Sequence, residues 1–261
     1  MKVKISGVSG RMGQAILRVA KMDKDVQIVG ALECNNKSEE IVTDNSTAMS
    51  CASGFDEFLS EADVLIDFTS PNRTLEILED AKKYEIPIVI GTTGFTDEQK
   101  KYILEISKNI PTVFSPNMSL GVNMLFKIVE DVVKKFPDYD IEIIELHHNK
   151  KKDSPSGTAT ELMKIAATSV EKKVSKTAVY GRHYTDSLRK KNEIGIFSIR
   201  AGDIVGEHTV YFAGTGERLE FTHRAHSRDT FAFGAIRAAK WIVGKKPGLY
   251  NMIDVLNLNA L

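Results

Sequence analysis

The first 33 residues limit the fold more than any other stretch of the chain. A strand pattern at residues 2–6 leads into a glycine turn, Gly7-Val8-Ser9-Gly10-Arg11-Met12-Gly13, and an amphipathic helical pattern follows. A second strand pattern at residues 26–32 ends at Glu33, about 20 residues after the last glycine. This order of strand, glycine turn, helix, strand and acidic residue predicts a Rossmann-type dinucleotide-binding unit.

Each part of this unit has a physical role toward a dinucleotide. Glycines let the backbone approach a pyrophosphate, the helix N-terminus offers free N–H groups, and Glu33 would accept hydrogen bonds from ribose hydroxyls. The candidate cofactor residues here are Glu33 and the turn residues Gly7, Val8, Ser9, Gly10, Arg11 and Met12. The glycine spacing is G-x-x-G-x-x-G rather than the commoner G-x-G-x-x-G. The alternative interpretation is therefore a structural turn in another kind of α/β protein.

The rest of the first half alternates between strand and helix patterns. Strands are predicted at 62–69, 87–90 and 111–114, and helices from Ser70 and over 97–108, which indicates a doubly wound parallel sheet. Residues 34–60 are polar and uneven, so we expect a loop with one short helix over 53–59. Ligands of such sheets gather beyond the carboxyl ends of the strands. That rule makes two turns candidate cofactor contacts, although each alone also fits an ordinary turn: Gly91, Thr92 and Thr93; Ser115, Pro116, Asn117 and Met118.

The second half has a different pattern, typical of an α+β domain. A helix is predicted over 121–135, a strand from Asp140, and a helix over 158–170. Three strand patterns follow at 195–200, 206–212 and 218–224, with glycine turns at 202–203 and 214–216 between them. We expect a mainly antiparallel or mixed sheet and a domain boundary near residues 117–120. A last helix over 230–243 and a short tail complete the chain.

Residues 140–160 (DIEIIELHHNKKKDSPSGTAT) hold the densest set of candidate site residues. His147 and His148 can exchange protons near neutral pH. Lys150, Lys151 and Lys152 place positive charge beside them, and Ser156, Gly157 and Thr158 lie where a helix begins and anions bind. The combination indicates a site for a small carboxylate or phosphate. The alternative is a solvated charge run followed by an ordinary helix N-cap.

Composition excludes several other classes. Lys plus Arg equals Asp plus Glu, at 35 each, so the overall charge does not indicate a nucleic-acid-binding protein. The two cysteines, Cys34 and Cys51, form neither a metal-ligand cluster nor a secreted disulfide framework. The chain starts directly in a strand and has no apolar run near the roughly 20 residues that span a membrane. We expect a cytoplasmic protein without metal, nucleic-acid or membrane partners.

Residues 145–159, ELHHNKKKDSPSGTA, resemble the motif E-A-H-H-x-x-K-x-D-A-P-S-G-T-A of the 4-hydroxy-tetrahydrodipicolinate reductases of bacterial lysine biosynthesis. Leu146 and Ser154 replace two alanines, and every polar position is kept. The GxxGRMG form of the first turn, the GTTG turn and the S-x-N-M-S turn also match this family at corresponding places.

The resemblance implies reduction of 4-hydroxy-tetrahydrodipicolinate to tetrahydrodipicolinate by NADH or NADPH. It implies His147 as the proton donor and acceptor, Lys151 as a second proton donor, and His148, Ser156, Gly157 and Thr158 as contacts of the dicarboxylate substrate. The turns at 91–93 and 115–118 would border the nicotinamide end of the cofactor. Some members have an arginine after the acidic residue to bind a 2′-phosphate. Cys34 stands there in this chain, which favours NADH, with NADPH also accepted.

The resemblance also implies a domain organisation. Residues 1–118, completed by 229–261, would bind the dinucleotide, and residues 119–228 would bind substrate and form a homotetramer. Hinges would lie near residues 118 and 228. Two other classes of protein fit the sequence less well. A nucleotide sensor without turnover does not need the polar motif at 147–158, and an aspartate-semialdehyde-type dehydrogenase needs a nucleophilic cysteine in the second domain, where this chain has none.

Overall fold

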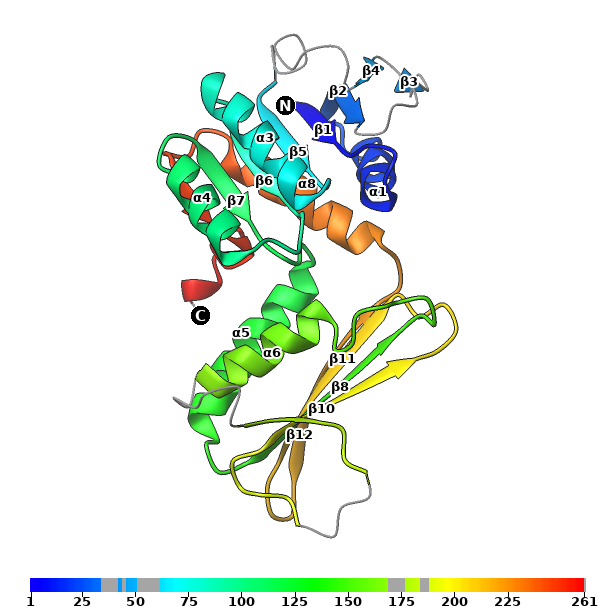
Figure 1. The fold of residues 1–261 in the computed structure, drawn as a ribbon, viewed down its shortest axis with the longest axis vertical. Coiled ribbons are helices and arrows are strands. Elements are labelled where there is room, and N and C mark those ends of the chain that lie inside the picture. Colours follow the sequence, from blue (N-terminus) through cyan, green and yellow to red (C-terminus); the bar gives the residue numbers. More distant parts are fainter. Residues whose placement is uncertain (34–41, 44–45, 51–61, 169–176, 184–187, 261) are drawn as a thin grey trace. The chain divides into compact units, whose positions relative to one another are not determined.

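The computed structural model describes residues 1–33, 42–43, 46–50, 62–168, 177–183 and 188–260 (Figure 1). The chain divides into two units, Met1–Leu120 with Arg228–Leu261, and Gly121–Ser227. Among the helices of the described residues, none is long and apolar enough to cross a membrane.

The first unit is built on one sheet with the strand order β13-β7-β6-β5-β1-β2-β4-β3. All neighbouring strands are parallel except β3 and β4. The chain leaves β1 toward β2 and later returns to β5 on the other side of β1, which makes the β1–β5 edge the topological switch point of the sheet. The strands are β1 (Lys2–Ser6), β2 (Gln27–Glu33), β3 (Val42–Thr43), β4 (Ser46–Ser50), β5 (Val64–Asp67), β6 (Ile88–Ile90), β7 (Pro111–Phe114) and β13 (Gly248–Tyr250).

Helices cover both faces of this sheet. On one face, Val3, Ile5 and Ile66 pack with buried residues of α1 (Arg11–Ala20) and α8 (Asp229–Ile242). On the other face, Leu65 and Ile88 pack with α3 (Pro71–Lys83) and α4 (Asp97–Ser107). The apolar run of β5 is buried along its whole length, as expected of a strand covered on both sides. The Rossmann-type doubly wound sheet predicted for this half is confirmed.

Two local predictions in the first unit need correction. The stretch expected to be a loop with a short helix contains β3 and β4, and β4 pairs with β2 in parallel. The tail beyond α8 contains β13, which extends the sheet beside β7, and the short helix α9 (Met252–Val255), followed by a 3₁₀ turn at Leu258–Ala260. These short strands are stabilised by pairing with a strand at the edge of the sheet. Their own residues do not predict that pairing. The helix expected over 53–59 lies outside the described residues.

The second unit is a five-stranded sheet, ordered β12-β11-β8-β10-β9, with two helices packed on one face. Burial alternates strictly along β8, so Ile141, Ile143, Glu145 and His147 all face the helices. The elements are α5 (Leu120–Lys135), β8 (Asp140–His147), α6 (Gly157–Thr168), β9 (Ala178–Tyr180), β10 (Ile194–Arg200), β11 (Gly206–Ala213) and β12 (Arg218–Ala225).

This sheet is mixed. β10 runs parallel to both β8 and β9, whereas β11 is antiparallel to both β8 and β12. The predicted glycine turn at 202–203 is present, but the strands that it connects are not neighbours in the sheet, because β8 lies between β10 and β11. The glycine turn at 214–216 does join the antiparallel neighbours β11 and β12. The placement of β8 at the centre brings residues from three strands around its carboxyl end.

Candidate active site

His147, the last residue of β8, is buried and faces the helices, with a relative exposure of 8%. Its Nδ1 lies 2.5 Å from Oε2 of Glu145, two positions back on the same side of the strand. Glu145 has no exposed surface. The period of two along a strand therefore creates a buried carboxylate–imidazole pair from nearly adjacent residues.

Arg200 completes this pair from the neighbouring strand β10, where it lies in register with His147. Its guanidinium makes two parallel contacts with Glu145, Nη2 to Oε1 at 2.8 Å and Nη1 to Oε2 at 2.9 Å. Nη2 also donates to the carbonyl oxygen of Asp153 at 2.7 Å. This fork is the geometry in which arginine binds a carboxylate most specifically.

The turn before α6 is attached to the same carboxylate. The backbone N–H of Ser156 donates to Oε1 of Glu145 at 3.1 Å, and the hydroxyl of Ser156 accepts from the N–H of Ala159 at 3.2 Å. The second contact is a helix N-cap. Gly157, the first helical residue, is exposed, and a side chain at that position would meet nothing within 4 Å. Gly157 thus borders open space, while Ser156 is fixed by its hydrogen bonds to Glu145 and Ala159.

His208 of β11, which lies in register with Glu145, contacts both Ser156 and His147. Its Nε2 lies 3.1 Å from Oγ of Ser156, and its ring centre lies 5.2 Å from that of His147. Burial lowers the pKa of His208 to about 3, so the ring is neutral at physiological pH. His208 therefore adds polar contacts beside His147 without adding positive charge.

The electrostatics of Glu145 are set by its partners. Burial raises the pKa of this carboxyl, but hydrogen bonds from His147 and Arg200 outweigh burial and hold it well below its ordinary value. Glu145 is ionised at every physiological pH and can only accept hydrogen bonds. It follows that Nδ1 of His147 carries a hydrogen and that Nε2 is the ring nitrogen that Glu145 does not engage.

The lysine run divides in the structure. Lys151 is partly buried, and its Nζ forms an ion pair of 2.8 Å with Asp153, whereas Lys150 and Lys152 are exposed. The N–H of Lys151 donates to the carbonyl of His148, which closes a turn directly after β8. Asp153 thus pairs with a lysine of the run.

The glycine turn after β1 has the conformation that a dinucleotide site needs. Gly7 has a φ of +80°, and a Cβ there would lie 2.8 Å from the carbonyl oxygen of Phe68 at the end of β5. A Cβ on Gly13 would lie 2.3 Å from the carbonyl oxygen of Gly7, so the helix approaches the turn too closely for any side chain. Gly10 caps α1 without a side chain, and Ser9, Gly10 and Arg11 are exposed. The exposed backbone at this helix start fits a pyrophosphate.

A buried carboxylate organises the turn after β6. Asp67 ends β5 with no exposed surface, and its oxygens accept hydrogen bonds from the hydroxyls of Thr69, Thr74 and Thr92 at 2.8, 2.5 and 2.9 Å. The N–H of Thr69 donates in turn to Oγ1 of Thr92 at 3.0 Å. The hydroxyl of Thr92 is therefore directed inward, while Thr93 is exposed and Gly91 packs against the ring of Phe68.

The third candidate turn follows β7. The hydroxyl of Ser115 donates to the carbonyl of Asn117 at 2.9 Å, and Oδ1 of Asn117 accepts from the N–H of Ser119 at 2.9 Å. Met118 is buried beneath α8, where Gly234 leaves room for its carbonyl, and Pro116 is exposed. This turn follows β7, the turn at 7–13 follows β1, and the turn at 91–93 follows β6. All three therefore lie at the carboxyl ends of strands in one parallel sheet.

The region of Glu33 is described only in part. Its backbone ends β2 and pairs with Ser50 of β4. Cys34 and the basic residue that follows in this loop, Lys37, lie outside the described residues.

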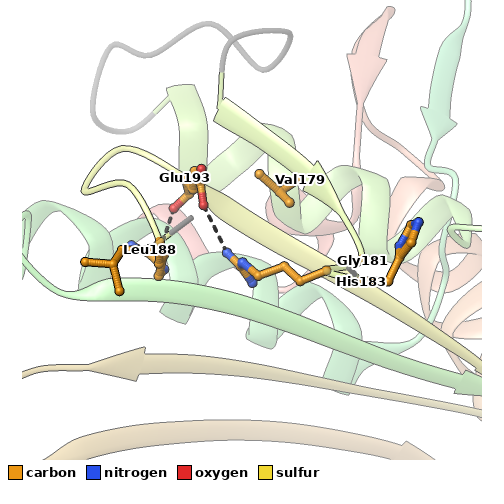
Figure 2. A pocket seen from close by; sticks show the side chains of 7 residues that line it. Val179, Gly181, His183, Leu188 and Glu193 are labelled. Atoms are coloured by element: carbon orange, nitrogen blue, oxygen red, sulfur yellow. Dashed lines mark hydrogen bonds and ion pairs between the residues drawn. The ribbon is translucent and has the colours of Figure 1, made fainter. Parts of the chain in front are cut away.

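A separate hollow of about 190 Å³ lies in the second unit (Figure 2). Its two arginines are paired already, Arg182 with Glu142 and Glu193, and Arg189 with Glu142 and Asp140. The lining residues are Val179, Gly181, Arg182, His183, Leu188, Arg189 and Glu193, and none of the predicted site residues is among them.

Four polar residues of these clusters were not predicted from the sequence: Glu145, Arg200, His208 and Asp67. For two of them, Glu145 and Asp67, the sequence pattern contained a sign of a functional role. Glu145 shares the inward register of Ile141 and Ile143, and Asp67 ends an apolar strand, so each places a charge where burial is expected. Arg200 and His208 carried none, because only strand pairing brings them to His147.

Comparison with known proteins identifies the family of the chain. Residues 1–118 match the family model "Dihydrodipicolinate reductase, N-terminus", and residues 121–256 match "Dihydrodipicolinate reductase, C-terminus". The 4-hydroxy-tetrahydrodipicolinate reductase of Syntrophotalea carbinolica is 48% identical over 266 residues, and that of Aquifex aeolicus is 46% identical over 267 residues, each covering 99% of both chains.

Solved structures show the same fold. The dipicolinate-bound dihydrodipicolinate reductase from Paenisporosarcina sp. TG-14 superposes with a TM-score of 0.81 at 23% identity, covering 97% of this chain and 98% of that one. An aspartate semialdehyde dehydrogenase from Vibrio cholerae superposes with a TM-score of 0.57 at 10% identity, covering 92% and 97%. The second likeness shows that the alternative dehydrogenase class shares the architecture, so sequence identity has to separate the two. The matches over the full length establish that this chain belongs to the dihydrodipicolinate reductase family.

Proposed function

We propose that this chain catalyses the NAD(P)H-dependent reduction of 4-hydroxy-tetrahydrodipicolinate to tetrahydrodipicolinate in the diaminopimelate and lysine pathway. The observation that carries the proposal is the position of His147, a proton-exchanging ring held by Glu145 beside the N-terminus of α6. A dicarboxylate substrate needs a proton source and N–H groups for its carboxylates, and both lie at one end of β8.

The proposed roles of the site residues follow from this placement. His147 donates or accepts a proton through Nε2, and Lys151 is the second proton donor. The N-terminus of α6 binds a substrate carboxylate through Gly157 and Thr158, whose backbone lies at the start of the helix. Ser156 supports this N-terminus, because its hydroxyl already contacts Ala159 and His208. His148 is proposed as a further substrate contact.

The cofactor is proposed to bind the first unit at the carboxyl ends of the strands of its sheet. The close approach at Gly7 and Gly13 fits a pyrophosphate, which would lie on the exposed turn from Gly7 to Met12. A reduced nicotinamide, when bound, supplies the hydride that no protein side chain can provide. The turns at 91–93 and 115–118 are proposed to border its nicotinamide end.

For the cofactor preference we propose NADH, with NADPH also accepted. Glu33 ends β2, where a carboxylate binds ribose hydroxyls and repels a 2′-phosphate. The neutral Cys34 provides no compensating charge at the next position. The ratio of kcat/KM for the two cofactors, at low and at high salt, measures this preference, because an exposed charge contact weakens with ionic strength.

We also propose a homotetramer that assembles through the second unit, in the cytoplasm. Alternation along β8 and β10 puts Ile144, Leu146, Phe197 and Ile199 on the sheet face opposite the helices, and Ile199 is 44% exposed. Apolar side chains on a solvated sheet face favour burial against another copy. Analytical ultracentrifugation measures the assembly directly.

The test of the catalytic proposal is the turnover of His147→Ala and Lys151→Ala with enzymatically generated substrate, followed by NAD(P)H absorbance. Each variant should lose roughly 10²-fold or more in kcat, since a positioned acid or base contributes about 10²–10⁴-fold. Cofactor affinity should not change. Lys152→Ala is the matched control, because Lys152 is an exposed lysine of the same run and should leave kcat near that of the unmodified chain.

Near-normal turnover in both His147→Ala and Lys151→Ala would refute the assigned roles. A second outcome tests the competing class. Cofactor binding with no substrate-dependent oxidation by the unmodified chain would favour a nucleotide sensor over a reductase.

A further inference from the structure

We propose that Glu145, held by Arg200, is a positioning residue that fixes the tautomer and direction of His147 and ties it to the N-terminus of α6. The inference rests on the proposed role of His147 and deepens it. It assigns a function to Glu145 and Arg200, which are not proposed as substrate contacts. The supporting observation is the hydrogen-bond geometry of the Glu145 carboxylate.

The hydrogen-bond capacity of Glu145 is completely used. An ionised carboxylate offers about four acceptor positions. Oε2 accepts from Nδ1 of His147 and Nη1 of Arg200, and Oε1 accepts from Nη2 of Arg200 and the N–H of Ser156. With these four donors from three separate segments, and a further hydrogen bond from the side chain of Ser198 on β10, the carboxylate cannot rotate without breaking at least two contacts.

This arrangement determines which nitrogen of His147 faces the substrate. Glu145 can only accept, so the neutral ring must carry its hydrogen on Nδ1 and leave the lone pair on Nε2. Donation of a proton from Nε2 then returns the ring to this same tautomer, with no ring flip between turnovers. A histidine whose ring is held by a buried carboxylate gains a defined direction.

The charges around His147 are balanced. Glu145 and Arg200 form a pair of opposite charges, and the ring of His208 is a neutral neighbour from β11. The effect of Glu145 on His147 is therefore chiefly directional, because Arg200 offsets much of its field. Arg200 also holds the carbonyl of Asp153, so one guanidinium fixes both the carboxylate and the turn that carries Lys151.

The main test is Glu145→Gln, which keeps the shape but replaces one acceptor oxygen with an NH₂ donor. That donor, facing Nδ1, would force the hydrogen of His147 onto Nε2. We expect kcat to fall roughly 10- to 100-fold, the usual effect of removing the partner that orients a functional histidine. The dissociation constant of the cofactor should stay unchanged.

Glu142→Gln is the matched control. Glu142 lies on the same strand and is also bound by arginines, Arg182 and Arg189, but it is on the opposite side and does not contact His147. Its kcat should equal that of the unmodified chain. A fall of similar size in both variants would overturn the proposal, because it would show a general effect of weakening β8.

A spectroscopic measurement tests the proposal first on the unmodified chain and then on the variant. The ¹⁵N chemical shifts of His147 in the unmodified chain should report the Nδ1–H tautomer at pH values where the ring is neutral, and those of Glu145→Gln should report Nε2–H. An Nε2–H tautomer in the unmodified chain overturns the proposal, even if Glu145→Gln fails to fold.

The outcomes separate this inference from the proposed function. If His147→Ala keeps its turnover, the catalytic role of His147 is wrong. If His147→Ala is inactive while Glu145→Gln keeps both turnover and tautomer, only the positioning role of Glu145 is wrong.

Discussion

Asp67 in the first unit and Glu145 in the second are both carboxylates without exposed surface, but their partners differ. Asp67 accepts hydrogen bonds from three threonine hydroxyls, which are neutral. Glu145 is bonded to the guanidinium of Arg200, to a ring nitrogen of His147 and to a backbone N–H. Asp67 and Glu145 therefore show, within one molecule, how burial and a cationic partner each affect the pKa of a carboxyl group.

The pKa values of the two groups move in opposite directions. Burial raises the pKa of Asp67 above its ordinary value, and the hydroxyls oppose this shift only in part. Burial also raises the pKa of Glu145, but the hydrogen bonds from His147 and Arg200 reverse the sign. A cationic partner, rather than exposure, therefore decides in which direction the pKa of a buried acid moves in this fold.

Opposite shifts imply opposite contributions to stability as pH changes. The folded state holds the proton of Asp67 more tightly than the unfolded chain does, so its contribution is greatest at low pH and is lost as pH rises above about 3.8, the ordinary value. Glu145 contributes most above its ordinary value of 4.5, and its contribution is lost as pH falls.

The largest effect is expected from Arg200→Ala, which removes the compensating charge and leaves Glu145 buried and ionised. Breaking a buried ion pair from one side costs about 3–5 kcal/mol. The free energy of unfolding, measured with urea at pH 7 and a fixed protein concentration, should fall by this amount.

Lys164→Ala is the control for that measurement. Lys164 pairs with Glu161 on the same unit, but both side chains are exposed, at 56% and 38%, so the change should cost less than about 1 kcal/mol. Equal losses in the two variants would mean that Glu145 does not depend on its cationic partner.

An intermediate effect is expected from Thr74→Val, which removes one of the three hydroxyls from Asp67 without changing side-chain shape. A hydrogen bond to a charged group contributes about 1.5–3 kcal/mol, so the free energy of unfolding should fall within that range at neutral pH. Thr112→Val is the matched change, because the buried Thr112 hydroxyl donates to the carbonyl of Ile110, and its loss should cost about 1 kcal/mol.

If Thr112→Val costs as much as Thr74→Val, the hydroxyls around Asp67 are ordinary neutral contacts. Asp67 would then carry little charge in the folded state at neutral pH.

The smallest effect on the free energy of unfolding is expected from Asp67→Asn, but the direction of its change with pH is clearly defined. Asparagine keeps an acceptor for the hydroxyls, so stability at pH 4 should change by about 1 kcal/mol or less. As pH rises, the unmodified chain should lose the contribution of Asp67 while the variant does not. Stability curves over pH 4–8 should diverge in favour of Asp67→Asn, and parallel curves would contradict the raised pKa of Asp67.

Much of this fold follows from local sequence. The glycine turn at 7–13, the apolar run of β5 and the alternation of β8 each predict their element, because each depends on residues within one or two turns of chain. β4 and β13 were missed, since a short strand at a sheet edge is stabilised by its neighbour rather than by its own residues.

The candidate site divides in the same way. His147, Lys151 and the turn before α6 lie within one motif and could be identified together. Arg200 could not, because 55 positions separate it from Glu145 and only the parallel register of β8 and β10 joins them. Asp67 was visible as an acid at the end of an apolar strand, but its hydroxyl partners come from three different segments.

The sheet of the first unit is assembled from both ends of the chain, and this has a consequence for synthesis on the ribosome. Val3, Ile5 and Val113 are made early, but the α8 residues that cover them, such as Ala235 and Ala239, are made only after the whole second unit. Until then, α1 covers this face of the nascent sheet without α8. Premature termination before residue 228 would therefore release a chain whose sheet face is only partly covered, the kind of apolar surface that chaperones bind and that aggregates when translation stalls.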